Sequence, residues 1–464
     1  MIYSRLLLFA TLFQLAFLAA ADKPNFIVVF VDDQGWADLG SYGSPTIQTP
    51  RLDRMADEGI RFTQFYVGSS VCSASRASLL TGRYSVRHGV KGVFFPGRGG
   101  MAPSEVTIAE VLKAQGYATA AIGKWHLGDS KKSLPRQQGF DEYFGIPYSN
   151  DMFIGPSQRF AKKVVFRQGY NREKALADQA FVKANPKDRN AIKKTRGLAD
   201  LVPLMRGEEI VEYPANQATL TRRYFDEVIS FIDKQAGQPF FVYLTPTMPH
   251  VPLFASADFL GNSKRGLYGD TIEEIDWNMG RLLDYLDKNK LSKNTFVIYA
   301  SDNGPWLGKG QNGGSAGHLR DGKFSNYEGG VRVPGIIRWP GKIPQGVVSD
   351  EIVSTIDLLP TIAHYASADL PDKTIDGLNI SAFLANPKIK IQRSVIYYLR
   401  NAKLEGLRVG DWKYSPVGFA KKNRKSPELF NLKDDPSEKN NLADNHPKKI
   451  HELEKILHKF KNSL

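Results

Sequence analysis

Asn25-Phe-Ile-Val-Val-Phe-Val31 is an apolar run that ends directly in the polar stretch Asp32-Asp33-Gln34-Gly35. A short run of this kind, bounded by turn-forming residues, is typical of a strand buried on both faces of a parallel sheet. Three later runs have the same form, at residues 117–122, 239–244 and 295–300. Helical patterns at 105–115, 218–234 and 269–288 lie between these runs. The alternation predicts an α/β fold with helices on both faces of one sheet.

Each of the four predicted strands leads into side chains that can carry chemistry. They are Asp32 and Asp33, Lys124 and His126, His250, and Asp302 and Asn303. In open α/β sheets, ligands bind beyond the carboxyl ends of the strands. One such ending could be ordinary turn chemistry, but four together predict a single site. The three carboxylates and the amide offer oxygen ligands, which favour Ca²⁺ or Mg²⁺ over zinc.

The chain of 464 residues contains one cysteine, Cys72, and has a formal net charge of +14. One cysteine can form no internal disulfide, and a lone cysteine is usually a buried, inert thiol. Cys72 fits that interpretation poorly, because serines and arginines surround it. The positive charge favours a polyanionic partner, either nucleic acid or a sulfated polysaccharide. No nucleic-acid-binding module is recognisable, so we expect no nucleic acid partner.

Residues 1–21 have the pattern of a signal peptide. Arg5 supplies a positive start, residues 6–18 are apolar, and Ala19 to Ala21 offer small residues for cleavage. The apolar stretch is short for a membrane anchor, and no later segment is long and apolar enough to span a bilayer. We therefore expect a secreted or periplasmic protein whose mature chain begins near Asp22.

The segment around the cysteine, Cys72-Ser-Ala-Ser-Arg76-Ala-Ser-Leu-Leu-Thr-Gly82, predicts a helix that begins near Cys72 and stops near Gly82. It resembles the signature of the formylglycine-dependent sulfatases, Cys-x-Pro-Ser-Arg followed by Thr-Gly. Ala74 stands where the commonest form of the signature has Pro, and an Ala form also occurs in that family. Further motifs follow in the order that the family uses: Asp32-Asp33-x-Gly, Gly-Lys124-Trp-His126, Gly-Ile-Pro-Tyr-Ser149, Pro-His250, Asp302-Asn303-Gly, Gly-Lys323 and Pro427-Glu-Leu-Phe-Asn-Leu432.

The resemblance implies a large mixed, mostly parallel sheet of the alkaline-phosphatase type and a smaller C-terminal α+β domain with a short antiparallel sheet. It implies that a maturase converts Cys72 to formylglycine. It also implies one Ca²⁺, or Mg²⁺, held by Asp32, Asp33, Asp302, Asn303 and residue 72. The hydrated aldehyde would attack sulfur, and its second hydroxyl would then release sulfate, which divides a hard displacement into two easier steps.

The resemblance also assigns roles to the other residues of these motifs. Arg76, one helical turn beyond Cys72, would stabilise the nucleophile. Lys124 and His126 would face the same way on an extended segment, with Lys124 holding sulfate and His126 acting as a base. His250 and Lys323 would bind sulfate and protonate the departing alcohol. Ser149 would contact sulfate or merely cap a turn.

We expect the chain to divide into a catalytic domain at residues 22–368 and a C-terminal subdomain at residues 369–464. Residues 353–366 are predicted as a helix, residues 394–399 and 406–414 as strands, and residues 447–464 as a closing helix. Residues 151–215 form a basic insertion. A basic segment is usually a solvated face, but this one follows Ser149 and could grip further sulfates of a polymer. Lys193, Lys194 and Arg196 are its candidates.

The function predicted from the sequence is hydrolysis of sulfate esters on a sulfated polysaccharide or oligosaccharide. A phosphodiesterase or phosphonate monoester hydrolase of the same superfamily is one alternative, since both anions are tetrahedral and fold alone cannot separate them. A catalytically inactive protein that only binds sulfated glycans is the other.

Overall fold

A computed structural model describes residues 23–464 apart from residues 236, 392, 394–395 and 421–425. The predicted signal peptide at residues 1–21 lies outside the described residues, as does the predicted start of a strand at Ser394. Within the described ranges, no helix combines the length and the apolar character needed to cross a membrane.

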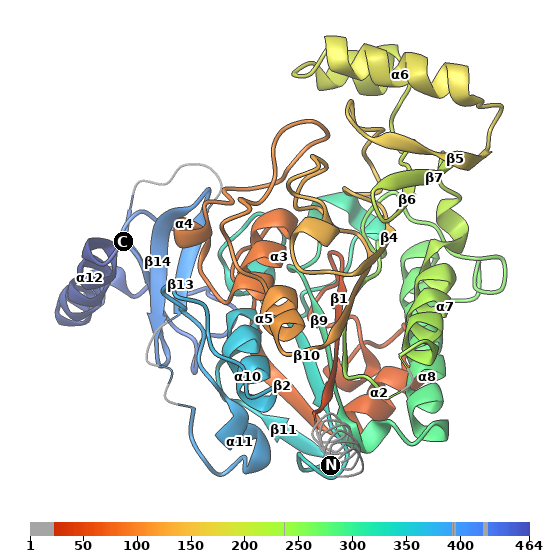
Figure 1. Cartoon of the computed structure of the whole chain (residues 1–464). Coiled ribbons are helices and arrows are strands. Elements are labelled where there is room, and N and C mark those ends of the chain that lie inside the picture. The colour runs from red at the N-terminus through yellow and green to blue at the C-terminus, as the bar shows by residue number, and fades with distance from the viewer. Residues whose placement is uncertain (1–22, 236, 392, 394–395, 421–425) are drawn as a thin grey trace, which may run out of the picture.

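The main sheet has twelve strands and is mixed but mostly parallel, as predicted. Its order is β11 (Val347–Ser349), β2 (Ile60–Tyr66), β10 (Arg332–Arg338), β9 (Thr295–Ser301), β1 (Asn25–Val31), β8 (Phe240–Thr245), β3 (Ala118–Gly123), β4 (Glu142–Gly145), β6 (Leu204–Arg206), β7 (Glu209–Tyr213) and β5 (Arg159–Phe166), with β12 (Val353–Ser354) beside β2. The four strands predicted to end in reactive residues, β9, β1, β8 and β3, are consecutive parallel neighbours. Their carboxyl ends therefore meet at one edge (Figure 1).

Strand β1 shows why helices cover both faces of the sheet. Alternate side chains of a strand point to opposite faces. Phe26, Val28 and Phe30 belong to one apolar core, and Ile27, Val29 and Val31 belong to the other. The first core is shared with α3 (Cys72–Thr81), α5 (Ile108–Ala114) and α10 (Leu358–Tyr365). The second is shared with α2 (Pro50–Asp57), α7 (Leu220–Asp233) and α8 (Leu267–Lys288), which lie across the sheet in Figure 1.

Two predicted helices begin later than the sequence suggested, and capping explains both. The predicted helix at residues 105–115 starts at Ile108, because Thr107 and Glu110 form a capping box. The predicted helix at residues 353–366 is wrong over its first turn. Residues 353–354 pair with β2 as strand β12, and a capping box between Ser354 and Asp357 then starts a short 3₁₀ turn that leads into α10.

The predicted basic insertion contributes strands to the main sheet, with β6, β7 and β5 extending it beyond β4. Its helix α6 (Arg172–Ala184) stands above these strands, at the top of Figure 1. A one-turn π-helix at Ala191–Thr195 then leads back toward the sheet. The insertion therefore rises from the same edge at which the reactive strand ends meet.

The C-terminal part contains the predicted antiparallel sheet, in the order β13 (Ile396–Arg400), β14 (Lys403–Val409), β15 (Trp412–Ser415) and β16 (Glu428–Asn431). The single strand predicted at residues 406–414 is wrong, because Gly410, with φ 56°, turns the chain between two strands. The predicted closing helix is α12 (Pro447–Asn462), which packs on this sheet through Leu453. The remaining short helices are α4 (Ser85–His88), α9 (Glu328–Val331) and α11 (Ser381–Ala385).

A buried ionic cluster joins the two sheets. The Lys413 ammonium on β15 lies 2.9 Å from Glu328 on α9 and 2.8 Å from Glu438. Tyr66 on β2 donates a hydrogen bond to the other oxygen of Glu328. Burial alone would raise the pKa of Glu328, but Lys413 and Arg408 outweigh it and lower the pKa to about 2. The C-terminal sheet is thus tied to the main sheet by compensated charges as well as by apolar contact.

Candidate active site

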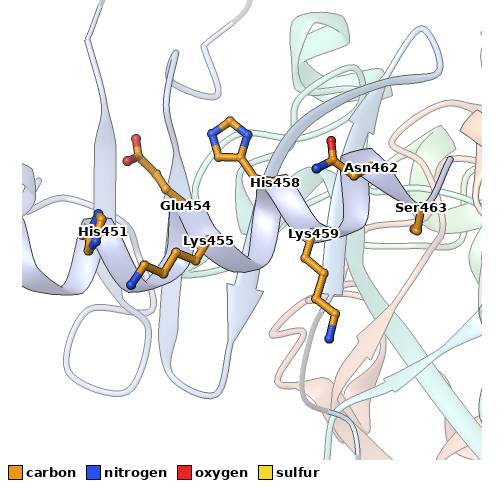
Figure 2. Close-up of a pocket in the computed structure, with 7 residues that line it drawn as sticks. All are labelled: His451, Glu454, Lys455, His458, Lys459, Asn462 and Ser463. Atoms are coloured by element: carbon orange, nitrogen blue, oxygen red, sulfur yellow. The ribbon is translucent and has the colours of Figure 1, made fainter.

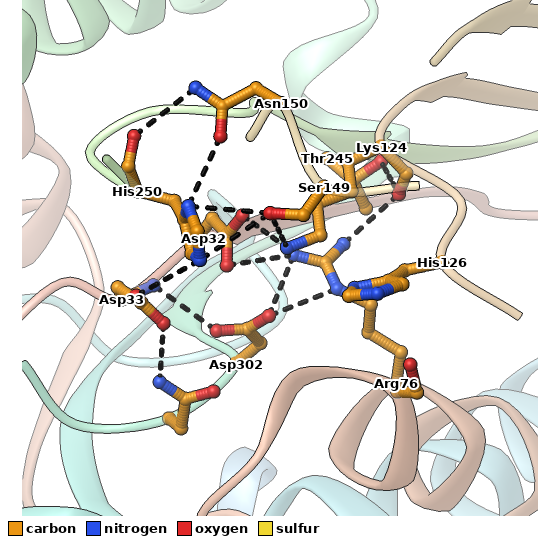
Figure 3. A network of polar contacts seen from close by, with 12 residues as sticks. Asp32, Asp33, Arg76, Lys124, His126, Ser149, Asn150, Thr245, His250 and Asp302 are labelled. Carbon is orange, nitrogen blue, oxygen red and sulfur yellow. Dashed lines mark hydrogen bonds and ion pairs between the residues drawn. The ribbon is translucent and has the colours of Figure 1, made fainter. Parts of the chain in front are cut away.

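Acidic and amide side chains from two neighbouring strands form the floor of the site. Asp32 and Asp33 follow β1, and Asp302 and Asn303 follow β9. The backbone N–H of Asp33 donates to Asp302 Oδ1 at 3.2 Å, and Asn303 Nδ2 donates to Asp33 Oδ1 at 2.7 Å (Figure 3). All four side chains are buried. The parallel register of β1 and β9 thus brings together the oxygen ligands that the sequence singled out.

This group of oxygens fits a hard divalent cation. Asp32 Oδ1 and Asn303 Oδ1 are buried and accept no hydrogen bond within the described part of the chain. One carboxylate oxygen each of Asp32 and Asp33 and the sulfur of Cys72 all lie within 4.8 Å of one another. Buried polar atoms normally have partners, and Ca²⁺ or Mg²⁺ prefers oxygen ligands. The orphaned oxygens are therefore the structural feature that a cation would satisfy.

The charges around this floor shift the pKa values of its acids in opposite directions. Burial would raise the pKa of Asp32, but Lys124, His250 and Arg76 outweigh it and hold that pKa far below its usual range. Burial and the neighbouring Asp32 raise the pKa of Asp302 to about 7. A bound divalent cation would make it easier for both carboxylates to be ionised.

Cys72 is the first residue of helix α3, as predicted, and its side chain is buried. The helix ends where Gly82 adopts φ 66°, a left-handed conformation that glycine tolerates. Every residue of α3 is buried, so the helix is fixed on all sides. Burial raises the pKa of the Cys72 thiol to about 12, with Lys124 and Lys323 opposing the effect.

Arg76 lies one turn along α3 and is completely buried. Its Nη2 lies 2.8 Å from Asp302 Oδ2, and its Nε donates to the same oxygen at 3.0 Å. Its Nη1 donates to the carbonyl oxygen of Lys124 at 3.1 Å. An ordinary surface arginine would make none of these contacts, so Arg76 links helix α3 to two strand ends.

Lys124 and His126 follow β3 but do not continue it as an extended segment. His126 has φ 60°, so the expectation of an extended segment is wrong at this position, and the spacing of two residues does not by itself make the two side chains face the same way. Lys124 Nζ lies 2.5 Å from Asp32 Oδ2 and 3.3 Å from Ser149 Oγ. His126 Nε2 lies 3.1 Å from the carbonyl oxygen of Phe94, which places its hydrogen on Nε2.

The other ring nitrogen of His126, Nδ1, is buried and has no hydrogen-bond partner among the described residues. Burial, reinforced by Lys124 and Arg76, lowers the pKa of His126 well below its ordinary value. The ring is thus neutral, with one nitrogen left to accept a proton.

Ser149, His250 and Lys323 complete the polar wall. Ser149 Oγ lies 3.3 Å from His250 Nδ1. His250 Nε2 lies 3.6 Å from Asp33 Oδ2, and Lys323 Nζ lies 2.6 Å from Asp33 Oδ1. Burial and the Lys323 charge lower the pKa of His250. All of the residues that the sequence singled out for this site therefore meet in one place.

Two residues of the network had not been anticipated. Asn150 Oδ1 lies 3.1 Å from His250 Nδ1, and Thr245 Oγ1 donates to the carbonyl oxygen of Lys124 at 2.8 Å (Figure 3). Asn150 directly follows the Gly-Ile-Pro-Tyr-Ser149 motif, which was the one available signal. Thr245 is an unremarkable end of a buried strand, and nothing in its local sequence marks it.

A cavity of about 420 Å³ opens onto Cys72. His126, Ser149, His250 and Lys323 line it together with Trp306 and with residues of the insertion. Asp32, Asp33 and Asp302 lie outside this lining, as do Arg76 and Lys124. Another hollow, of about 650 Å³, lies along α12 (Figure 2). All its lining residues come from α12 and from Ser463 directly after it, so no side chains from separate elements meet there. The hydroxyl of Tyr414 donates a hydrogen bond to Glu454 at 2.8 Å.

Comparison with known proteins agrees with this geometry. The family model described as "Sulfatase" matches residues 24–368, and one described as "N-sulphoglucosamine sulphohydrolase, C-terminal" matches residues 318–463. Arylsulfatase A of Bos taurus is 38% identical over 461 residues, covering 94% of this chain and 86% of that protein.

Two solved structures have the same fold. The PsFucS1 sulfatase from Pseudoalteromonas sp. has a TM-score of 0.79 and 27% identity, covering 97% of this chain and 92% of that one. Ps i-CgsB, solved in complex with k-i-k-neocarrahexaose, has a TM-score of 0.76 and 30% identity, covering 94% and 92% of the two chains.

Proposed function

The chain belongs to the sulfatase family and is a sulfuric ester hydrolase, and on that premise we propose that it acts through a formylglycine made from Cys72 beside one divalent cation. The observation that carries the proposal is the position of Cys72. It begins a buried helix, faces a cavity, and has its sulfur within 4.8 Å of carboxylate oxygens of Asp32 and Asp33. Asp32 and Asp33 would hold a cation beside residue 72.

The proposed formylglycine and the proposed cation have distinct tasks. Formylglycine at position 72 would supply, as its hydrate, one hydroxyl for attack on sulfur and a second for release of sulfate. The cation would supply a Lewis acid. Asp32, Asp33, Asp302 and Asn303 would hold it. Four protein oxygen ligands suit Ca²⁺, which takes six to eight oxygens, better than Mg²⁺, which usually keeps several waters.

The remaining residues would bind sulfate and move protons. Ser149, His250 and Lys323 line the cavity at residue 72, and Lys124 Nζ lies 3.3 Å from Ser149 Oγ. These four residues would hold the sulfate oxygens. Arg76 would orient the nucleophile from within α3. His126 Nδ1, which lacks a hydrogen-bond partner among the described residues, would accept the proton during sulfate release. Lys323 Nζ would supply a proton to the departing alcohol, as would His250 Nε2 once the ring has taken up a second proton.

The substrate class we propose is a sulfated polysaccharide or oligosaccharide. The formal net charge of +14 would concentrate such polyanions. Support also comes from Ps i-CgsB, whose structure holds a neocarrahexaose.

We further propose export through residues 1–21, modification by a maturase that accepts Ala74, and a division into a catalytic domain at 22–368 and a C-terminal subdomain at 369–464.

The decisive measurement is the mass of the tryptic peptide that contains residue 72, from protein produced with such a maturase. Conversion to formylglycine removes roughly 18 Da from a cysteine. We expect that loss together with turnover of an aryl sulfate, and no turnover by Cys72→Ser. A protein that keeps an unmodified Cys72 yet binds sulfated glycans would favour the inactive binding protein. Faster turnover of a phosphodiester or phosphonate monoester than of the matched sulfate would favour the other alternative.

A further inference from the structure

The insertion supplies cationic side chains to the mouth of the cavity. Arg189, Lys193 and Lys194 all line it, together with Trp306 and Lys323 from a later part of the chain. They come from the segment that contains the π-helix Ala191–Thr195. These three positive charges thus share one cavity with Ser149, His250 and Lys323, which would hold the scissile sulfate.

One of the three charges is already neutralised. Lys193 Nζ lies 3.0 Å from Asp151 Oδ2 and 2.5 Å from the Asp151 carbonyl oxygen. Arg196, another candidate from the sequence, pairs with the buried Asp178 at 2.9 Å and does not line the cavity. Both cations are therefore already held in ion pairs with carboxylates of the protein. We no longer assign Lys193 and Arg196 to the binding of further sulfates.

Arg189 and Lys194 differ from these two. Both are exposed, and within the part of the chain that the structure describes neither forms an ion pair with a carboxylate. Two unneutralised cations facing one cavity attract anions, and a guanidinium suits a sulfate or carboxylate especially well because its N–H groups match two oxygens.

Contacts that lead back to the nucleophile helix hold Arg189 in position. Its guanidinium carbon lies 4.2 Å from the centre of the Phe95 ring. Nearby, Arg98 Nε donates to the carbonyl oxygen of Pro186 at 2.8 Å, which ties the two loops together. The N–H of Phe94 donates to Ser73 Oγ on α3 at 3.1 Å. Arg189 thus has a defined position relative to residue 72.

We propose that Arg189 and Lys194 form a second anion subsite, which binds an anionic group on the substrate beyond the sulfate that is hydrolysed. That group is a sulfate ester or a carboxylate carried by the same saccharide. The proposal rests on the proposed function, since it places the scissile sulfate at residue 72. It narrows the substrate class to saccharides with at least two anionic groups.

The test compares three kinds of substrate: an aryl sulfate, a monosulfated disaccharide, and two dianionic disaccharides, of which one carries a second sulfate and the other a uronate carboxylate. For Arg189→Ala combined with Lys194→Ala, we expect kcat/KM on the dianionic disaccharides to fall roughly 10- to 100-fold, mainly through KM. Turnover of the aryl sulfate should stay within about twofold of the native enzyme. Whichever dianionic substrate suffers the larger loss identifies the second group.

Lys187→Ala is the matched control, because Lys187 is an exposed cation of the same segment that does not line the cavity. Lys187→Ala should leave kcat/KM unchanged on all three kinds of substrate. An equal loss of kcat/KM in Lys187→Ala would show that the effect comes from the overall positive charge of the protein and not from a subsite. An equal loss of kcat/KM on the aryl sulfate would show that the double variant damages the catalytic site. Either result overturns the subsite.

Failure of the proposed function would look different, because the native enzyme would then turn over no sulfate ester at all. Calorimetric titration of the same disaccharides into the native protein and the double variant would still decide the inference in that case. Tighter binding of the dianionic disaccharide by the native protein, lost in the double variant, supports the subsite. Equal affinities refute it.

Discussion

Asn150 contacts both ends of His250. Its Oδ1 lies 3.1 Å from Nδ1 of the imidazole, and its Nδ2 donates to the backbone carbonyl oxygen of His250 at 3.3 Å. The carbonyl oxygen of Val251 also lies 2.5 Å from Nδ1. Two acceptors at Nδ1 keep the ring hydrogen there and leave Nε2 facing Asp33. Asn150 is thus a positioning residue for the proposed proton donor.

Replacing Asn150 by alanine should therefore impair protonation of the leaving group. We expect Asn150→Ala to lower kcat by roughly 10-fold or more on aryl sulfates whose phenol is a poor leaving group. Good leaving groups need little protonation, so their turnover should fall much less. Measuring kcat across phenols of different pKa should give a steeper dependence than in the native enzyme. The same loss for every phenol would instead indicate general damage to the site.

Calcium should stabilise the protein through the orphaned oxygens of Asp32 and Asn303. At a Ca²⁺ concentration about 100-fold above Kd, binding adds about 2.7 kcal/mol to the free energy of unfolding. Thermal unfolding in Ca²⁺ and in a chelator should show this difference for the native protein. It should be strongly reduced in Asn303→Ala and retained in Asn312→Ala, which alters an exposed asparagine of the following loop. An unchanged Ca²⁺ response in Asn303→Ala would contradict the assignment.

His88 should make the fold sensitive to acid. Its Nε2 lies 3.0 Å from Ser78 Oγ on α3, and its Nδ1 accepts the N–H of Val90 at 3.2 Å. Burial, with Arg83 nearby, lowers the pKa of His88 from 6.5 to about 3. Between about pH 6.5 and pH 3, His88 is therefore protonated in the unfolded chain and neutral in the folded chain. The stability that neutral His88 contributes is present above about pH 6.5 and is lost as the pH falls toward 3.

Urea unfolding between about pH 7 and pH 5 tests this expectation. The free energy of unfolding of the native protein should fall more steeply with acid than that of His88→Gln, which cannot take up a proton. Comparing slopes removes the contribution of the carboxylates, which titrate in both proteins. Parallel slopes would mean that His88 has no abnormal pKa.

Lys413 should be essential to the junction between the two sheets. Lys413→Met leaves the buried carboxylates of Glu328 and Glu438 without their shared cation, and breaking a buried pair in this way costs about 3–5 kcal/mol. Equilibrium unfolding should show that loss. Lys433→Ala, at an exposed position of the same subdomain, should change the free energy of unfolding by less than about 0.5 kcal/mol. A small effect of Lys413→Met would show that water or a neighbouring cation replaces the ammonium.

Much of the fold was predictable because its central strands are apolar throughout and end in turn residues. Strand β1 has the predicted bounds, Asn25–Val31, and α3 begins and ends at the predicted residues. Part of the candidate site was also readable, because Asp32, Asp33, Lys124, His126, His250, Asp302 and Asn303 stand at strand ends where apolar runs stop. Cys72, Arg76, Ser149 and Lys323 became candidates through the family resemblance instead. Their proximity followed from parallel pairing, which places those ends at one edge.

What could not be predicted depends on partners distant in the sequence. Nothing near Lys193 or Arg196 indicates that Asp151 and Asp178 neutralise them, whereas Arg189 faces the cavity without such a partner. The role of Asn150 likewise depends on a histidine 100 residues away. The turn at Gly410 is different, since Gly410-Asp411 is a recognisable hairpin sequence and could have divided the predicted strand.

The position of β2 has a consequence for the timing of biosynthesis. This strand leads directly into Cys72, yet it pairs with β10, β11 and β12, which end as late as Ser354. At 5–20 residues per second, the roughly 280 residues between Cys72 and Ser354 take on the order of 15–60 s to synthesise. Helix α3 cannot be enclosed before then. A modifying enzyme thus has that interval to reach a side chain that the finished protein hides completely.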